Sequence, residues 1–243
     1  MTNTVLPDMI RSSRLITCFS RRHDGNLSLS YGDTTQALTH RQDFFGRQGI
    51  GYKDLVCAKQ IHAANVHLAR AVDMGRGALL YEGALDNADA FVTQERNLPL
   101  VILTADCLSL FFHDPRHAAI GIAHAGWRGT QLEIGPRVLE TMAREFDSAP
   151  GDIWVQLGPC IRPCCYEVSG DFVRHFAHGV TQRKDQWFFD LPAVNIQQLV
   201  AAGVPAEHIM DCGICTACQS DQYFSFRKEG DSAGRLASVI MLR

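Results

Sequence analysis

Apolar residues gather in short runs along the chain, and the densest runs lie in the middle of the sequence. Residues 101–104 and 108–112 follow each other closely, and residues 118–125 come after the turn signal Asp114-Pro115. Runs this short and this apolar are typical of strands that are buried on both faces. We therefore expect 108–112 and 118–125 to be neighbouring strands of a central sheet.

Further short runs predict strands on both sides of this region. A segment at 55–67 reads as extended, and the other strands are expected at residues 15–19, 88–93, 153–157, 223–226 and 236–242. Strands outnumber helices and do not alternate with them regularly. This pattern favours an α+β fold over a doubly wound α/β fold, and at this length we expect a single domain over residues 1–243.

Helical periodicity and end signals predict four helices. They are expected at residues 35–48, 130–146, 169–178 and 192–203. Thr130 and Ser169 suit the cap position, and Pro192 suits a first helical turn. Pro136 predicts a kink or a late start of the second helix.

Composition excludes several classes of protein. The chain has 243 residues, a net charge of −3, 46% apolar residues and 20% charged residues. These values exclude a disordered chain, and no apolar run is long enough to span a membrane. Without net positive charge or a Lys/Arg run, we expect no nucleic-acid partner. Residues 1–20 show no secretory signal, because charged residues and Pro7 interrupt them, so we expect a cytoplasmic protein.

The sequence has nine cysteines, an odd number that cannot pair completely in disulfides. In a reducing compartment they serve as core residues, metal ligands or catalytic groups. Cys107 and His124 each lie at the end of an apolar strand, and His62 follows Gln60-Ile61 in an extended segment. Two histidines and a cysteine with an open fourth position are the pattern of catalytic zinc. A buried thiol beside a histidine at the edge of the core is the alternative, and sequence spacing does not decide between them.

The other candidate metal ligands are cysteines in the last third of the chain. Cys212, Cys215 and Cys218 form a C-x-x-C-x-x-C run, which is a local metal signal, and Cys160, Cys164 and Cys165 precede it. Iron–sulfur or structural zinc is one interpretation of this run. We favour cysteines that simply pack in a loop, because a fourth ligand at suitable spacing is missing. The earlier cysteines could supply that ligand only if their segment folded back.

Two other chemistries are disfavoured by what the motifs lack. Multicopper sites use many histidines, often as His-x-His, and none of the ten histidines forms such a pair. A mononuclear copper site has the right ligand types, but no Met is placed near them. The sequence also lacks G-x-G-x-x-G and G-x-x-x-x-G-K-[ST], so neither nucleotide-binding motif is present.

Motifs along nearly the whole chain resemble those of the YfiH-like family, also labelled laccase-domain or polyphenol-oxidase-like proteins. The most specific are Thr104-Ala-Asp-Cys107 and His124-Ala-Gly-Trp-Arg-Gly129. The others are Phe19-Ser-Arg-Arg22, Gln60-Ile-His62, Ala88-Asp-Ala90, Gly158-Pro-Cys-Ile161, Cys164-Cys-Tyr-Glu-Val168, Cys215-Thr-Ala-Cys218 and Phe224-Ser-Phe-Arg227. Ala63 departs from the family pattern, in which Gly usually follows the histidine.

The resemblance implies a three-layer α+β fold with central mixed sheets flanked by helices. It also implies one zinc per chain, held by His62, Cys107 and His124. The laccase label of the family would suggest copper, but the histidine pattern described above disfavours it. The implied activity is phosphorolysis of adenosine, inosine, guanosine and methylthioadenosine, together with adenosine deamination. Substrate or phosphate candidates from the matching motifs are Arg22, Gln60, Arg128 and Arg227, and candidate proton-transfer or supporting groups are Asp106 and Glu167.

Other functions stay open at this point. Cys107 and His124 could act without metal as the nucleophile and base of a hydrolase or amidase. The resemblance also suggests polyphenol oxidation or the editing of peptidoglycan precursors as activities. A binding protein that has the same fold but no enzymatic activity is a further alternative. The sequence does not indicate the oligomeric state.

Overall fold

The computed structural model describes residues 15–243; the prediction about a signal in residues 1–20 falls largely outside them. The strands are β1 (Leu15–Phe19), β2 (Val66–Leu68), β3 (Ala90–Thr93), β4 (Leu100–Thr104), β5 (Leu108–Asp114), β6 (Ala119–Ala125), β7 (Trp154–Leu157), β8 (Glu167–Val168), β9 (Val180–Arg183), β10 (Gln186–Phe189), β11 (Ile209–Asp211) and β12 (Leu236–Leu242). The helices are α1 (Thr34–Arg47), α2 (Trp127–Gln131), α3 (Ile134–Phe146), α4 (Leu191–Ala201) and α5 (Phe226–Glu229).

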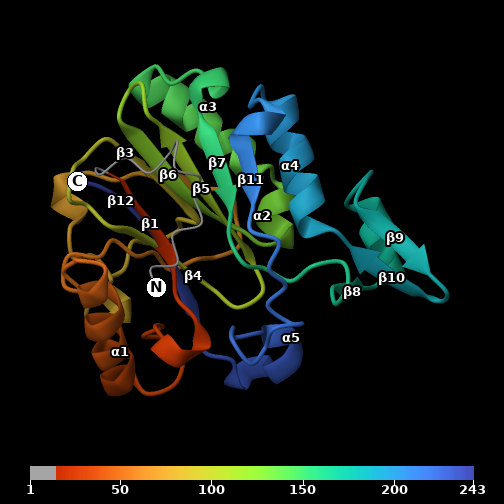
Figure 1. Ribbon diagram of the computed structural model, residues 1–243, viewed down its shortest axis with the longest axis horizontal. Helices are drawn as coiled ribbons and strands as arrows, with labels where there is room; N and C mark the ends of the chain where they lie inside the picture. Colours follow the sequence, from red (N-terminus) through yellow and green to blue (C-terminus); the bar gives the residue numbers. More distant parts are fainter. Residues whose placement is uncertain (1–14) are drawn as a thin grey trace.

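Two sheets pack together in the middle of the molecule (Figure 1). A mixed sheet has the order β11-β7-β5-β6-β3-β2, and an antiparallel sheet has the order β1-β12-β4. Helices α3 and α4 cover the outer face of the mixed sheet, and α1 covers the outer face of the other sheet. The predicted α+β fold with sheets flanked by helices is therefore confirmed. A small third sheet, β8-β10-β9, projects from one side (Figure 1).

Burial on both faces explains why the central strands read as unbroken apolar runs. In β5, Leu108, Leu110 and Phe112 face the helices, whereas Phe111 faces the second sheet. Because side chains alternate along a strand, both faces must be apolar when both are covered. Strands β5 and β6 pair in antiparallel register from Leu108↔Ala125 to Asp114↔Ala119, which confirms the predicted neighbours.

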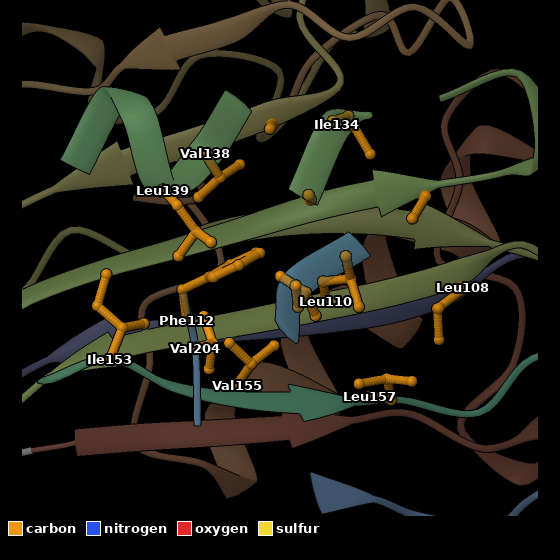
Figure 2. Packing of buried hydrophobic residues seen from close by; sticks show 14 of the residues in the cluster. Leu108, Leu110, Phe112, Ile134, Val138, Leu139, Ile153, Val155, Leu157 and Val204 are labelled. Atoms are coloured by element: carbon orange, nitrogen blue, oxygen red, sulfur yellow. The ribbon is translucent and has the colours of Figure 1, made fainter. Parts of the chain in front are cut away.

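The helix-facing core depends on matching the period of α3 to that of the strands. Figure 2 shows Ile134, Val138 and Leu139 of α3 above the alternating residues of β5 and β7. These three helical positions share one face at a period of 3.6 residues. All three are at most 2% exposed, so this contact closes one side of the core.

Three sequence-based predictions were wrong in detail. Thr130 lies inside α2 and does not cap a helix. The helical conformation is interrupted at Glu133, whose φ is 59°, and α3 begins at Ile134, so the late start predicted from Pro136 is confirmed. Ser169 makes no capping hydrogen bond and starts only the 3-10 turn Gly170–Arg174, because Phe172 and Phe176 turn towards Phe189.

The third error concerns residues 223–226, which form a turn and the start of α5 instead of a strand. The alternating pattern misleads because the Ser225 hydroxyl donates a hydrogen bond to the buried Asp106. The segment 55–67, expected to be extended, forms little regular sheet. It pairs with other segments through single bridges at Val56 and Ala58 before β2 begins at Val66. Among residues 15–243, no helix is long and apolar enough to cross a bilayer.

Candidate metal centre and cavity

His62, Cys107 and His124 come together at one end of the central sheets. Cys107 lies in the turn between β4 and β5. His124 lies near the end of β6, where it pairs with Ser109 of β5. His62 belongs to the loop before β2. One ligand atom from each of the three residues lies within 4.8 Å of the other two, a spacing that could hold a metal ion. His62 is exposed, Cys107 is half-buried, and His124 is buried.

Asp89 positions both histidines. Its carboxylate accepts hydrogen bonds from the backbone N–H groups of Ile61 at 3.2 Å, His62 at 3.0 Å and Ala63 at 2.9 Å. It also lies 2.9 Å from Nδ1 of His124. An N–H on Nδ1 leaves the Nε2 lone pair free for a metal, as is usual for a histidine ligand supported by a carboxylate.

Ionised Asp89 is well suited to this role. Burial raises the pKa of Asp89, but hydrogen bonds from His124 and from the backbone of Ala63 and His62 outweigh burial and hold that pKa below its usual value. His62 has a φ of 60°, in the left-handed region that non-glycine residues seldom adopt. The three N–H bonds to Asp89 over-determine this conformation, so the loop holds the His62 ring near His124, with ring centroids 4.7 Å apart.

A missing side chain makes room beside the ligand atoms. A Cβ atom on Gly126 would lie 3.0 Å from Sγ of Cys107 and 3.4 Å from Cδ2 of His62. It would also lie 3.7 Å from Nε2 of His124. Glycine at this position therefore keeps open a space beside the three side chains.

The protonation of Cys107 fits metal binding, whereas His124 has to release one proton when a metal binds. Burial raises the pKa of the Cys107 thiol, but the charge of His124 and hydrogen bonds with both histidines lower it to about 6. Burial lowers the pKa of His124, whereas the Cys107 thiolate and Asp89 raise it to about 9. Without a metal, the two residues form a thiolate–imidazolium pair at neutral pH. A thiolate is also the form of cysteine that binds metals.

The three residues line a cavity of about 870 Å³. This volume is within the usual range for small-molecule sites. Trp127, Tyr166 and Phe172 form an aromatic wall, with ring centroids of Trp127 and Phe172 5.2 Å apart. The cavity therefore combines a possible metal centre with flat apolar surfaces.

The structure separates the three candidate arginines. Arg128 lines the cavity with its guanidinium 4.2 Å from the Trp127 ring, and this guanidinium has no hydrogen bond or ion pair with residues 15–243. Arg227 also lines the cavity, but it donates to the carbonyls of Cys165 at 3.2 Å and Glu167 at 2.7 Å. Arg22 does not line the cavity and pairs with Glu229 at 2.6 Å.

Two further candidates line the cavity with their polar atoms already occupied. The Gln60 amide both donates to and accepts from the backbone of Leu103, at 2.8 Å in each case. Asp106 accepts from the Thr216 hydroxyl at 2.6 Å, the Ser225 hydroxyl at 3.0 Å and the Arg227 N–H at 2.6 Å. These contacts support positioning roles for Gln60 and Asp106.

Glu167 differs from these two residues, because it is exposed in β8 at the cavity wall. Its carboxylate is therefore accessible to a ligand. Of the two proposed proton-transfer candidates, Glu167 is the more available and Asp106 the more constrained.

The cysteines of the last third do fold together, contrary to the premise used above. Cys164, Cys165, Cys215 and Cys218 bring their sulfur atoms within 4.8 Å of one another. Cys160 and Cys212 are not part of this group. Two of the four cysteines thus come from the earlier segment, which folds back against the C-x-x-C turn.

Comparison with known proteins identifies the family. The family described as multi-copper polyphenol oxidoreductase laccase matches residues 17–243. The chain belongs to this family. The purine nucleoside phosphorylase YlmD of Geobacillus stearothermophilus is 32% identical over 225 residues, covering 88% of this chain and 82% of YlmD. An adenosine deaminase, RL5, from an unknown prokaryotic organism is 32% identical over 221 residues, covering 86% of this chain and 82% of RL5.

Solved structures of this laccase-like family agree. The crystal structure of YlmD from Geobacillus stearothermophilus has a TM-score of 0.92 at 30% identity, covering 95% of this chain and 93% of that one. The YfiH protein of Bacillus licheniformis has a TM-score of 0.91 at 29% identity, covering 94% and 93%. The resemblance inferred from the motifs is therefore confirmed, and the relatives' names indicate an enzyme.

The role of Asp89 was missed from the sequence. Ala88-Asp-Ala90 was noted as a family motif, but Asp89 received no function. The available signal was a carboxylate at the start of a buried apolar strand, since buried charges require partners. The aromatic wall was also missed. Trp127 and Tyr166 stand in family motifs that assign them no role, and nothing in the local sequence singles out Phe172.

Proposed function

We propose that the protein is a zinc-dependent purine nucleoside phosphorylase that also deaminates adenosine. The observation that carries this proposal is the convergence of His62, Cys107 and His124 at an 870 Å³ cavity walled by aromatic rings. The relatives named as purine nucleoside phosphorylases and adenosine deaminase support the same assignment. The expected substrates are adenosine, inosine, guanosine and methylthioadenosine, with inorganic phosphate as the second substrate.

The donor set suits one zinc ion. Two imidazoles and a thiolate leave a fourth position open, and the space beside Gly126 lies against the side chains of all three residues. Bound zinc supplies Lewis acidity and lowers the pKa of a coordinated water to about 7. The two ligand groups in residues 15–243 contain only two histidines between them, which disfavours multicopper chemistry despite the family's description.

The aromatic wall suits a purine base. Stacking on an aromatic side chain is worth about 1–3 kcal/mol per base and does not depend on which purine is bound. Trp127 and Tyr166 line the cavity, so either ring could take this role. Stacking of this kind accounts for a broad preference among adenosine, inosine and guanosine.

Arg128 is the side chain most available for phosphate. Arg227 is engaged by two carbonyls and Arg22 is neutralised by Glu229, whereas the guanidinium of Arg128 is unpaired within residues 15–243 and stacks on Trp127. A phosphate oxygen would attack C1′ of the ribose while the bond from C1′ to N9 breaks. The departing purine takes up a proton, and exposed Glu167 is the candidate group for this proton transfer.

The decisive experiment separates phosphorolysis from deamination. Adenosine is incubated with purified protein, with and without phosphate, and the products are resolved by chromatography. Adenine and ribose 1-phosphate that form only with phosphate support the phosphorylase, and inosine that forms in both conditions supports the deaminase. Adenosine that survives both conditions in zinc-loaded protein would overturn the proposal.

Two substitutions assign the residues. Cys107→Ala should remove zinc and both activities, and full activity in that variant contradicts the proposal. Arg128→Ala should raise the KM for phosphate at least tenfold, with little change in deamination. Arg116→Ala is the matched control, because Arg116 is exposed, pairs with Asp152 and does not line the cavity.

One observation favours a second candidate, a metal-free cysteine hydrolase or amidase acting on peptidoglycan precursors. The pKa of Cys107 is lowered to about 6 beside His124, as a cysteine nucleophile requires. Iodoacetamide distinguishes the two candidates when labelling of the Cys107 peptide is measured by mass spectrometry. A zinc ligand reacts only after a chelator is added, whereas a free thiolate reacts at once.

A further inference from the structure

Four cysteine sulfurs lie together outside the proposed catalytic centre. Cys164 and Cys165 come from the loop before β8, and Cys215 and Cys218 come from the loop between β11 and α5. The Cys218 sulfur lies 3.4 Å from that of Cys164 and 3.3 Å from that of Cys165, and all four lie within 4.8 Å of one another. We propose that these residues, which we call the four-cysteine cluster, bind a second, structural zinc ion.

Backbone pairing between the two loops places the cysteines. Cys160 and Cys215 form a parallel bridge, in which the N–H of Thr216 donates to the carbonyl of Cys160 at 3.0 Å and the N–H of Cys160 donates to Ile214 at 3.3 Å. The side chain of Arg162 also donates to the Ile214 carbonyl, at 3.2 Å. These contacts hold the loops in register independently of the sulfur atoms, so the cluster is preformed.

The spacing fits a single tetrahedral ion. With zinc–sulfur bonds of about 2.3 Å, tetrahedral geometry places ligand sulfurs about 3.8 Å apart. The Cys218 sulfur lies 3.4 Å and 3.3 Å from those of Cys164 and Cys165, slightly less than this value, and no pair of the four exceeds 4.8 Å. An iron–sulfur cluster would spread the cysteines more widely, because they are shared among two or more iron atoms. Four thiolates around one ion match the closed coordination of structural zinc.

The local backbone also supports a thiolate at Cys215. Residues 215–218 form a C-x-x-C turn closed by the N–H of Gln219, which donates to the Cys215 carbonyl at 3.0 Å. The backbone N–H groups of Cys218 and Arg162 point at the Cys215 sulfur. Cys215 is buried, whereas Cys164 and Cys218 are exposed, so a metal can enter from solvent.

An ion here would stiffen one wall of the cavity. Cys165 is followed by Tyr166 and Glu167, which line the cavity, and the Cys165 carbonyl accepts a hydrogen bond from Arg227. The other loop carries Thr216, which holds Asp106. With four protein ligands, this zinc has no open position and takes no part in turnover. The inference therefore does not rest on the proposed function.

Zinc stoichiometry tests the proposal. Reduced, metal-stripped protein is titrated with zinc chloride, and bound zinc is measured by mass spectrometry after gel filtration. Wild type should bind two equivalents, Cys107→Ala one, and the double variant C164S/C218S one. Because Cys164 and Cys218 are exposed, their replacement by serine should leave the core intact. Cys212→Ser, on the same loop but outside the cluster, is the matched control and should bind two.

Two further measurements sharpen this test. Cobalt-loaded Cys107→Ala should show the intense sulfur-to-metal charge-transfer absorption of a four-thiolate site, and C164S/C218S should lack most of it. In the zinc-loaded protein, Cys164 and Cys218 should resist alkylation until a chelator is added. One equivalent of zinc in both wild type and C164S/C218S, or a disulfide to Cys218 in protein kept under reductant, would overturn the proposal. Visible iron absorption in the purified protein would overturn the choice of zinc.

Discussion

Asp89 and Asp106 are two buried aspartates that each hold a loop against the same cavity, yet they differ in what donates to them. Three backbone N–H groups and the His124 ring surround Asp89. Asp106 is surrounded by two hydroxyls and one backbone N–H. A backbone N–H can only donate, whereas a hydroxyl can also accept. Replacing one carboxylate oxygen of Asp89 by an NH₂ group would therefore leave two donors facing each other. At Asp106 the same replacement can be accommodated, because a hydroxyl can accept from the NH₂ group.

The two loops have different functions. Asp89 fixes the positions of His62 and His124, so it acts on the proposed catalytic zinc. Asp106 fixes the segment that carries Arg227, so it acts on the cavity wall. The comparison indicates that a buried carboxylate close to reactive groups can serve purely to position them.

The largest effect is expected for Asp89→Asn. Either orientation of the amide places an NH₂ group against a backbone N–H or against His124, where it favours the wrong tautomer. We expect zinc affinity at the His62–Cys107–His124 site to fall about 10–100-fold, as is typical when such a supporting partner is lost. Competition with a chromophoric chelator measures this affinity.

Asp86→Asn is the control for Asp89→Asn. Asp86 is 70% exposed and pairs with Lys59 at 2.9 Å, close in sequence but away from the ligands. Zinc affinity should be unchanged in this control. Equal affinities in Asp89→Asn and Asp86→Asn would show that Asp89 does not position the ligands.

A smaller effect is expected for Asp106→Asn. The amide oxygen can keep the hydrogen bonds from the Arg227 N–H and the Ser225 hydroxyl. The amide NH₂ then donates to the Thr216 hydroxyl, which changes from a donor to an acceptor. We expect a loss of about 1 kcal/mol in the free energy of unfolding, and no change in zinc affinity at the triad. Urea unfolding and chelator competition measure the two quantities. A loss of triad zinc in Asp106→Asn would remove the distinction between the two aspartates.

The strands were more predictable from sequence than the site. Leu15–Phe19 and Leu236–Leu242 have the predicted bounds, because the central sheets bury whole apolar runs. Cys107 and His124 were expected together, since each ends a strand of one hairpin region. His62 is far from both in sequence, and only the family motif placed it with them. Spacing along a chain does not reveal which loops meet.

The same limit explains the errors. Ser225 reads as the polar position of a strand, but its hydroxyl is drawn to Asp106, which is distant in sequence. The four-cysteine cluster is not evident from the C-x-x-C-x-x-C run, because two of its four ligands come from a distant segment. Pairing of Cys160 with Cys215 is a tertiary contact, and no local spacing encodes it. Local pattern therefore predicts elements, whereas positioning residues and folded-back ligands depend on long-range contacts.

The smallest effect is expected for Thr216→Val. This variant tests whether the change of the Thr216 hydroxyl from donor to acceptor explains why Asp106, unlike Asp89, tolerates an amide. Thr216→Val in the wild type removes one donor to Asp106 and should cost about 1 kcal/mol. In the Asp106→Asn background, the same change removes the acceptor that the amide NH₂ needs and leaves that group buried without a partner. The double variant should therefore lose more than the sum of the single losses, by at least about 0.5 kcal/mol in urea unfolding. Additive losses would mean that the Thr216 hydroxyl does not reverse, and that the tolerance of the Asp106 site has another origin.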